Sequence, residues 1–461
     1  MSKPITAALA AALLAGCAAA PQKPAAPATP YDFAADPYPS TYQRVASPPV
    51  LLQHATVLTG TGARLEDADV LMRDGRIVAV GTALDAPADA VRVDASGKWV
   101  TPGIIDIHSH LGVYPSPGVS AHSDGNEMTS PVTPNVWAEH SVWPQDPGFL
   151  TALAGGVTSL QVLPGSANLI GGRGVTLKNV PATTYQAMKF PGAPWGLKMA
   201  CGENPKRVYG QKGGPGTRMG NVAGYRAAFA DAAEYMKKRQ AGGKEAEGKR
   251  DYRNDTLAGA INGDIRVHIH CYRADEMATM LDLAREFGFR ISAFHHGVEA
   301  YKIADRLAAE GVCGALWADW WGFKMESFDG IQENIALVDR APGGCAIVHS
   351  DSEEGIQRLN QEAAKVIASA GRAGIPIAPE HAIAWLTANP ARAMGIDGQT
   401  GTLEAGKMAD VVLWNGSPFS SYAQAEQVYI DGARLYDRRD PARQPVSDFM
   451  LGQPAARGGV R

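Results

Sequence analysis

Short apolar runs alternate with amphipathic stretches through most of the chain. Runs rich in β-branched and other large apolar residues lie at residues 104–107, 158–163, 197–200, 265–269, 290–294 and 345–348. Residues 223–238 and 275–287 have the spacing of amphipathic helices. Strand–helix alternation over roughly 290 residues predicts parallel βαβ units, and that length suits an α/β fold with a (β/α)8 TIM-like barrel.

A doubly wound parallel sheet would give the same alternation. Such a sheet usually carries a glycine-rich phosphate-binding turn after a strand. The nearest match is the stretch 171–174, and its spacing is wrong for dinucleotide binding. The barrel is therefore the favoured fold.

Both ends of the mature chain contain short β-type runs instead of strand–helix alternation. These runs lie at residues 50–52, 69–72, 76–80, 92–94, 409–414 and 427–430. Asp74-Gly75 between two of them is a hairpin signal. We expect a small composite β-sandwich from residues 48–102 and 400–440, a barrel over 103–399, and a tail over 441–461.

The first residues have the pattern of an export signal. Lys3 precedes an apolar run over residues 5–14, which is shorter than the roughly 20 residues that a membrane-spanning helix needs. The run ends in Leu-Ala-Gly-Cys at Cys17 and resembles the lipobox of bacterial lipoproteins, although an ordinary signal peptide would also end in small residues. The resemblance implies lipid attachment at Cys17 and an exported, membrane-anchored protein on the periplasmic side or cell surface.

The segment after the signal is rich in alanine and proline and predicts a tether over residues 18–47. Ala18, where an aspartate would retain the protein in the inner membrane, implies the outer membrane if the host is Gram-negative. The other cysteines are Cys201, Cys271, Cys313 and Cys345. Export permits disulfides, but spacing alone leaves both pairing and free thiols open.

Composition excludes some classes of function. Apolar residues make up 45% of the chain and charged residues 20%, as in an ordinary globular enzyme. The formal net charge of −4 provides no basic surface for nucleic acid. We expect a small-molecule substrate.

The most specific chemical signal is the pair His108 and His110 at the end of the first apolar run. Residues i and i+2 of a strand point to the same face, and the carboxyl ends of barrel strands form the active-site mouth. Two converging imidazoles there suit a zinc-class cation, although two structural histidines would share this spacing.

Four other strand candidates also end in residues of the metal-ligand type. These residues are Glu203, His270, His296 and Asp351. A single histidine or aspartate is commonly structural. Their recurrence at the same topological position predicts one shared site.

The order HxH, then Glu or Lys, then His, His and Asp resembles the amidohydrolase superfamily, and within it the imidazolonepropionase-like amidohydrolases. The segments that carry the likeness are residues 100–110, 155–159, 202–206, 389–391 and 401–410. The likeness covers about residues 48–440. It implies a barrel enzyme that hydrolyses C–N bonds with one or two divalent metal ions.

The resemblance implies that His108 and His110 hold the first metal, and that His270 and His296 hold the second or the only one. Of the adjacent histidines, His268 is expected to be a core residue or a support for the ligands, and His295 a neighbour of the site instead of a ligand. Zinc is the expected metal, and manganese, iron or cobalt would suit the same ligands.

The bridging ligand is either Glu203 or a carboxylated Lys198, of which Glu203 is favoured by its place at the strand's end. Asp351 is the expected general base and acid. An aspartate at this point would also suit a helix N-cap.

Three further residues are candidates for substrate binding. Trp320 and Lys324 would provide an apolar wall and a partner for a carboxylate. Arg173 is a second candidate partner for a carboxylate. Core packing of Trp320, an ion pair between Lys324 and Glu326, and a structural turn at Arg173 are the alternatives.

The expected reaction is hydrolysis of an amide, cyclic amide or dipeptide-like bond. A deaminase that acts on an amidine carbon would use the same site. A catalytically silent lipoprotein is a third reading, which the retention of Asp351 and the paired histidines disfavours.

Overall fold

The computed structural model describes residues 1, 31–116, 118–242 and 248–444. Its centre is an eight-stranded sheet that curves into a nearly closed barrel, with strand order β13-β12-β11-β10-β9-β8-β7-β6. The strands are β6 (Ile104–Ser109), β7 (Val157–Val162), β8 (Ile170–Lys178), β9 (Trp195–Ala200), β10 (Ile265–Cys271), β11 (Ile291–His296), β12 (Cys313–Leu316) and β13 (Ala346–Val348). The barrel predicted from the sequence is confirmed.

Strand β8 differs from the expected all-parallel pattern. It pairs antiparallel with both β7 and β9, whereas the other neighbouring strands pair in parallel. Only residues 163–169 connect β7 to β8. A parallel connection needs a crossover of about a dozen residues or more, so this short connection returns the chain in the opposite direction.

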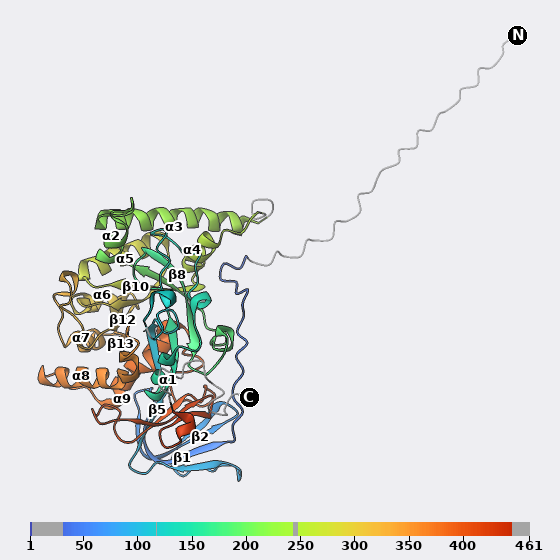
Figure 1. The fold of residues 1–461 in the computed structure, drawn as a ribbon, viewed down its shortest axis with the longest axis vertical. Helices are drawn as coiled ribbons and strands as arrows, with labels where there is room; N and C mark the ends of the chain where they lie inside the picture. The colour runs from blue at the N-terminus through green and yellow to red at the C-terminus, as the bar shows by residue number, and fades with distance from the viewer. Residues whose placement is uncertain (2–30, 117, 243–247, 445–461) are drawn as a thin grey trace.

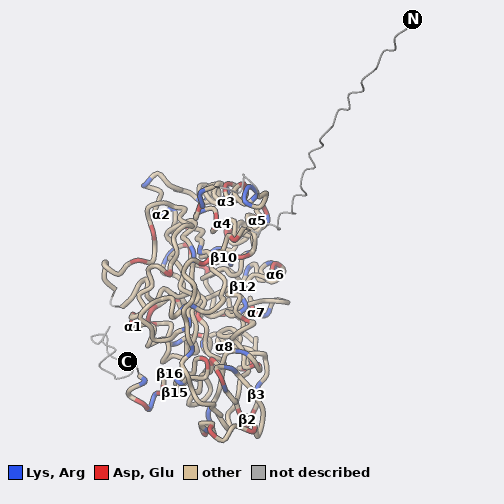
Figure 2. Tube along the Cα trace, turned by 90° about the vertical axis from the view of Figure 1, so that its right-hand side faces the viewer, with Lys and Arg blue, Asp and Glu red and all other residues tan. Residues whose placement is uncertain are grey.

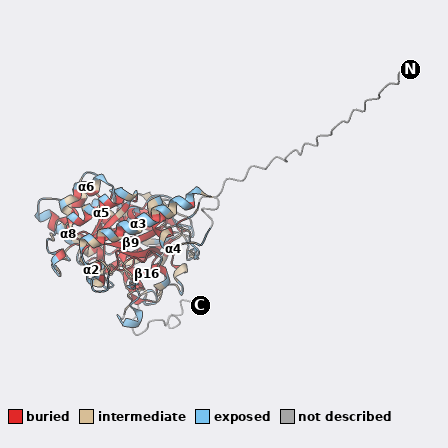
Figure 3. Ribbon diagram, turned by 90° about the horizontal axis from the view of Figure 1, so that it is seen from above, coloured by how far each residue is buried: buried red, intermediate tan, exposed pale blue. Residues whose placement is uncertain are grey.

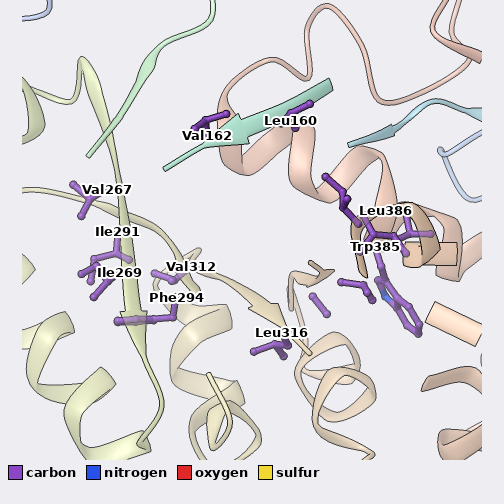
Figure 4. Close-up of a cluster of buried hydrophobic side chains, with 14 of the residues drawn as sticks. Leu160, Val162, Val267, Ile269, Ile291, Phe294, Val312, Leu316, Trp385 and Leu386 are labelled. Carbon is purple, nitrogen blue, oxygen red and sulfur yellow. The ribbon is translucent and has the colours of Figure 1, made fainter. Parts of the chain in front are cut away.

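Helices pack around the barrel and bury its outer surface (Figures 1 and 3). They are α1 (Pro147–Ala154), α2 (Glu203–Tyr209), α3 (Arg218–Ala241), α4 (Tyr252–Asn262), α5 (Ala274–Phe287), α6 (Ala304–Ala309), α7 (Asn334–Arg340), α8 (Leu359–Arg372), α9 (Pro379–Ala382) and α10 (Ala388–Met394). Apolar side chains of β7, β10, β11 and β12 belong to one large core cluster with the short helix η8 (Ile383–Leu386) (Figure 4). Burial of this surface stabilises the barrel that positions the site.

A second sheet is built from both ends of the chain and lies at the lower end of the molecule in Figure 1. Its strands are β1 (Val50–Leu58), β2 (Arg64–Arg73), β3 (Arg76–Gly81), β4 (Val91–Asp94), β5 (Trp99–Pro102), β14 (Val411–Trp414), β15 (Ala425–Ile430) and β16 (Ala433–Asp437). Asp74 and Gly75 join β2 to β3 with φ of 53° and 78°. These left-handed values are what a two-residue hairpin turn requires.

A buried lysine connects the barrel to this sheet. Lys178 at the end of β8 is fully buried, and its Nζ lies 3.2 Å from Asp410 and 2.8 Å from Asp431. Tyr42 donates a hydrogen bond to the Asp431 carboxylate. Two carboxylates and one ammonium group therefore join the barrel, the sheet and the N-terminal segment.

The described part of the predicted tether, residues 31–47, is extended and lies along the side of the barrel (Figure 1). Phe33 is 1% exposed, and Lys189 binds the Asp36 carboxylate at 2.8 Å. Ordered packing therefore begins by residue 31. The predicted signal and Cys17 lie outside the described residues, as do residues 445–461.

The four cysteines of the described chain form two disulfides. Cys201–Cys271 joins the carboxyl ends of β9 and β10, and Cys313–Cys345 joins the amino ends of β12 and β13. Each bond connects neighbouring strands of the barrel.

Basic and acidic residues are interspersed over the molecule (Figure 2). None of the helices in the described ranges is both long enough and apolar enough to cross a membrane.

Candidate metal centre

Histidine and aspartate side chains from several strands converge at the carboxyl ends of the barrel strands. Two groups have their ligand-type atoms within 4.8 Å of one another: His108, His296 and His349, and His108, His110 and Asp351. His108 belongs to both groups. The structure therefore brings together the HxH pair, the second of the adjacent histidines on β11 and the aspartate after β13.

The Nε2 atom of His108 lies at the middle of this cluster. It is 3.3 Å from His110 Nε2 and 3.3 Å from Asp351 Oδ1. Asp351 Oδ1 is also 3.2 Å from His110 Nε2. His270 adjoins the cluster through His296, because their ring centroids lie 4.6 Å apart.

Backbone conformation supports a functional role for two of these residues. His296 and Asp351 have φ of 72° and 52°, in the left-handed region that non-glycine residues adopt infrequently. Such strained residues concentrate at functional sites, where the surrounding structure holds them. Here the strain turns both side chains into the cluster at the ends of their strands.

A buried hydrogen-bond network holds the first strand against the last. Asp106 on β6 accepts hydrogen bonds from the Ser350 hydroxyl and from the backbone N–H of Ser350 and His108. Asp351 N–H donates to His108 O at 3.1 Å. These contacts fix Asp351 beside the HxH pair, although the two strands form no ladder in the described sheet.

The residues present fit a divalent cation. The Nδ1 atom of His296 is buried and makes no hydrogen bond within the described residues. A buried polar atom without a partner costs about 1–3 kcal/mol. Neutral imidazoles and a carboxylate are the donors that zinc-class metals take, so a bound cation would satisfy such nitrogens.

Burial keeps the four fully buried imidazoles beside Asp351 uncharged. It lowers the pKa of His108, His270 and His296 well below the ordinary value, and the charge of nearby Lys198 adds to the effect. Burial likewise lowers the pKa of His349 to about 4. The lone pairs of these rings are therefore available to a metal at neutral pH.

Asp351 is ionised in the same surroundings. Burial raises its pKa, but the hydrogen bond with His110 and the electrostatic interactions with His110, His349 and Lys198 outweigh burial and leave the pKa below its ordinary value. A carboxylate in this state can accept a proton.

The two candidate bridging residues lie in different places. Lys198 is buried in the cluster, with Nζ 3.4 Å from His108 Nε2, and burial lowers its pKa to about 8. Glu203 begins α2, and its carboxylate faces Lys324 Nζ at 3.5 Å. The structure thus brings Lys198 into the cluster and directs Glu203 toward the rim.

The loop after β12 contributes aromatic and charged side chains to the rim. Trp317 packs on His296 with ring centroids 4.2 Å apart, and Trp320, 39% exposed, lies next to Trp317 at 5.9 Å. Lys324 Nζ lies 4.2 Å from the centre of the Tyr272 ring. These side chains border the cluster on one side.

A single amide links the rim to the cluster. Asn204 accepts a hydrogen bond from Lys324 Nζ at 3.1 Å, while its Nδ2 lies 3.3 Å from His270 Nε2. Lys324 is therefore connected to the metal centre through one residue.

The structure does not bring Arg173 to the cluster. Arg173 lies on β8, and its guanidinium packs on the Trp137 ring at 4.4 Å. It donates hydrogen bonds to the Thr256 hydroxyl and to Phe33 O. The glycine-rich stretch is a buried strand instead of a loop, and Arg173 anchors the N-terminal segment.

Four residues of the site are absent from those predicted from the sequence: His349, Tyr272, Trp317 and Asn204. His349 stands two residues before Asp351, so the i, i+2 rule that identified the HxH pair could have found it. Tyr272, Trp317 and Asn204 lie in segments that follow strands and reach the site through loop conformation, which no sequence period encodes.

Comparison with known proteins places the chain in a family. Residues 345–435 match the model of the amidohydrolase family. The crystal structure of an amidohydrolase from Thermotoga maritima MSB8 is 36% identical and superposes with a TM-score of 0.78 over 84% of this chain and 100% of that chain.

Two curated relatives are similar along most of this chain. The amidohydrolase tasK of Hapsidospora irregularis is 33% identical over 89% of this chain, which spans only 44% of that relative. The imidazolonepropionase of Mesorhizobium japonicum is 26% identical over 76% of this chain and 87% of its own length. Together with the site described above, these similarities show that the chain belongs to the amidohydrolase family of enzymes.

Proposed function

We propose that this protein hydrolyses an amide, cyclic amide or dipeptide-like C–N bond at a divalent metal site, with Asp351 as the general base and acid. The observation that carries the proposal is the meeting of His108, His110 and Asp351 within 4.8 Å at the mouth of the barrel. An ionised aspartate beside buried neutral imidazoles is the arrangement that hydrolysis requires.

The residues that would hold the metal are His108, His110, His270, His296 and Asp351, with His349 beside them. Zinc is the proposed metal, because imidazole and carboxylate form its usual ligand sets. When bound, such a cation lowers the pKa of water to about 7 and polarises a carbonyl oxygen. Whether one or two ions bind depends on the bridging ligand.

Lys198 is the better-supported bridge, in its carboxylated form. Carboxylation needs the neutral amine, and burial, which lowers the pKa of Lys198 to about 8, makes that form more accessible near neutral pH than in an exposed lysine. Its Nζ already adjoins His108. Glu203 remains the alternative, and it would have to leave Lys324 to reach the cluster.

Asp351 performs the proton transfers in this proposal. Its carboxylate accepts a proton from the attacking water and returns the proton to the leaving nitrogen, so that the amide and water become a carboxylic acid and an amine. The backbone hydrogen bond to His108 O and the Asp106–Ser350 network hold the carboxylate in position. General acid–base catalysis of this kind contributes about 10²–10⁴-fold to the rate.

The rim suits a substrate that has an apolar group and a carboxylate. Trp320 and Trp317 offer aromatic surface next to His296, and Lys324 offers an ammonium group that is only partly buried. An N-acyl amino acid or a dipeptide has both groups on the amine side of its scissile bond.

We also propose that the enzyme is exported and anchored by lipid at Cys17. The two disulfides support export, because such bonds persist in oxidising compartments. Because residues from Phe33 onward pack against the barrel, the barrel would lie close to a membrane in which the lipid at Cys17 is inserted.

Replacement of Asp351 by asparagine removes the proton acceptor while keeping an oxygen ligand. We expect Asp351→Asn to retain the metal content of wild type and to lose about 10²–10⁴-fold in kcat, measured with a panel of N-acyl amino acids, dipeptides and lactams. Undiminished turnover by a metal-loaded variant would remove Asp351 from the chemistry, and ammonia release from amidines alone would identify a deaminase instead.

The bridge is tested by comparing Lys198→Ala with Glu203→Ala. We expect Lys198→Ala to lose at least one metal equivalent and Glu203→Ala to keep the wild-type content, because only Lys198 lies in the cluster. The measurement is metal stoichiometry by mass spectrometry of the purified proteins, with His110→Ala as the positive control. Metal loss in Glu203→Ala alone would assign the bridge to Glu203.

Loss of the Lys324 charge should weaken binding of carboxylate-bearing substrates. A charge-assisted hydrogen bond contributes roughly 1.5–3 kcal/mol, so we expect Lys324→Met to raise KM about 10–100-fold for an N-acyl amino acid and much less for its uncharged amide. Trp320→Leu should raise KM more for substrates with an aromatic group than for substrates without one.

The matched control for Lys324→Met is Lys302→Met. Lys302 is a nearby rim lysine that is paired with Glu299 and Asp329. Equal effects of the two lysine variants, or equal effects of Lys324→Met on the acid and its amide, would contradict the assignment.

Membrane attachment depends in this proposal on the thiol of Cys17. We expect Cys17→Ala to move the protein from the membrane fraction to the soluble fraction and to abolish incorporation of labelled fatty acid. If wild type and Cys17→Ala both stay in the membrane fraction and neither incorporates the label, a lipid anchor at this residue is excluded.

A further inference from the structure

We propose that His295 and His268 form a chain of hydrogen bonds, running in one direction, that fixes the tautomer of the metal ligand His108 and aims its Nε2 at the cluster. The inference rests on the proposed metal site, and it assigns positioning roles to two histidines outside the candidate ligand set. Both are fully buried, and neither lies in either of the potential metal-binding groups.

The three rings are joined by two short contacts. His108 Nδ1 lies 2.9 Å from His295 Nδ1, and His295 Nε2 lies 3.0 Å from His268 Nδ1. β6, which carries His108, and β11, which carries His295, are not neighbours in the sheet. The chain therefore crosses the interior of the barrel.

Each contact between two ring nitrogens needs one N–H and one lone pair. His108 Nε2 faces His110, Asp351 and Lys198, so it must keep its lone pair to bind a metal. The proton of a neutral His108 then resides on Nδ1 and is donated to His295 Nδ1.

That first assignment fixes the rest of the chain. Because His295 Nδ1 accepts, the proton of His295 resides on Nε2 and is donated to His268 Nδ1. The proton of His268 must in turn reside on its own Nε2. Once His108 is required to bind a metal, the tautomers of both supporting histidines follow.

The side chain of Gln161 lies near the far end of the chain. His268 Nε2 and both amide atoms of Gln161 are buried without a hydrogen-bond partner within the described residues. A Cβ atom at Gly196 would lie 2.8 Å from Gln161 Nε2 and 3.2 Å from His268 Cδ2. Glycine at this position leaves room for both groups, and Gln161 has the amide oxygen that can accept from His268.

The supporting residues of a metal-bound histidine fix its ring orientation and tautomer and raise its basicity. A carboxylate in this role would add a negative charge to a site that already contains Asp351. Neutral imidazoles give the same orientation without that charge. In the opposite tautomer, His108 would present an N–H to the cluster and could not bind a metal through Nε2.

The direct test is the protonation pattern of the three rings in the full-length wild-type enzyme, loaded with zinc and labelled with ¹⁵N-histidine. We expect NMR correlations to assign protons to His108 Nδ1, His295 Nε2 and His268 Nε2. A proton on His295 Nδ1 or on His268 Nδ1 would overturn the proposal. The same spectrum of the metal-free enzyme tests the hydrogen-bond chain by itself. Failure of the wild-type enzyme to bind zinc would refute the proposed function, and this second spectrum would still test the chain.

Variants test the consequence for metal binding. His295→Leu removes the acceptor for His108, and we expect its zinc affinity, measured by chelator competition, to fall about 10–100-fold. His295→Gln has both an accepting oxygen and a donating N–H and should recover most of that affinity. Wild-type affinity in His295→Leu would overturn the proposal, as would equal losses in the two variants.

The matched control is Phe294→Leu. Phe294 is the preceding residue on β11, is fully buried and belongs to the apolar core cluster of the outer helices. This variant should lower thermal stability while leaving zinc affinity within about twofold of wild type. An equal loss of zinc affinity in the control would show that the effect of His295→Leu is general loosening of the strand.

Discussion

The structure depends on one constraint: imidazole groups are buried side by side in the mouth and interior of a closed barrel. His108, His268, His270, His295, His296 and His349 are all 3% exposed or less. Water cannot satisfy ring nitrogens at such depth, so each needs a protein partner or a cation. The histidine contacts inside the barrel satisfy some of these nitrogens, and the unpartnered Nδ1 of His296 is suited to a metal.

The scaffold serves this arrangement at several levels. Asp106 and Ser350 hold the first strand to the last, where the sheet has no ladder. The Cys201–Cys271 bond joins the ends of β9 and β10 next to His270. The reversed strand β8 connects the barrel to the second sheet through Lys178. A metal site needs such support because ligand positions must be held closely.

Much of the fold and of the candidate site could be predicted from the sequence. Parallel strands have a strong apolar signature, and the i, i+2 spacing of His108 and His110 follows from strand geometry alone. Strand β8 could not be recognised in the same way, because residues 170–178 contain three glycines, Arg173 and Lys178 and form no continuous apolar run. The short β7–β8 connection was the available signal.

The candidate residues whose positions the sequence did not resolve share a physical cause. Lys198 and Glu203 lie five positions apart, but Lys198 is inside the barrel while Glu203 begins a helix at the rim. Arg173 resembled a loop residue, but it lies in a buried strand and packs against Trp137 and Trp195. Such placements depend on where a strand ends and how the next segment turns, which is set by tertiary packing.

The central claim is that His108, His110 and Asp351 surround one cation site together with the histidines of β11 and β13. The most direct measurement is anomalous X-ray diffraction at the zinc edge from crystals of the zinc-loaded enzyme. The account predicts an anomalous peak within bonding distance of His108 Nε2, shared with His110 or Asp351. A peak elsewhere on the molecule, with these side chains bonded only to one another, would contradict the account.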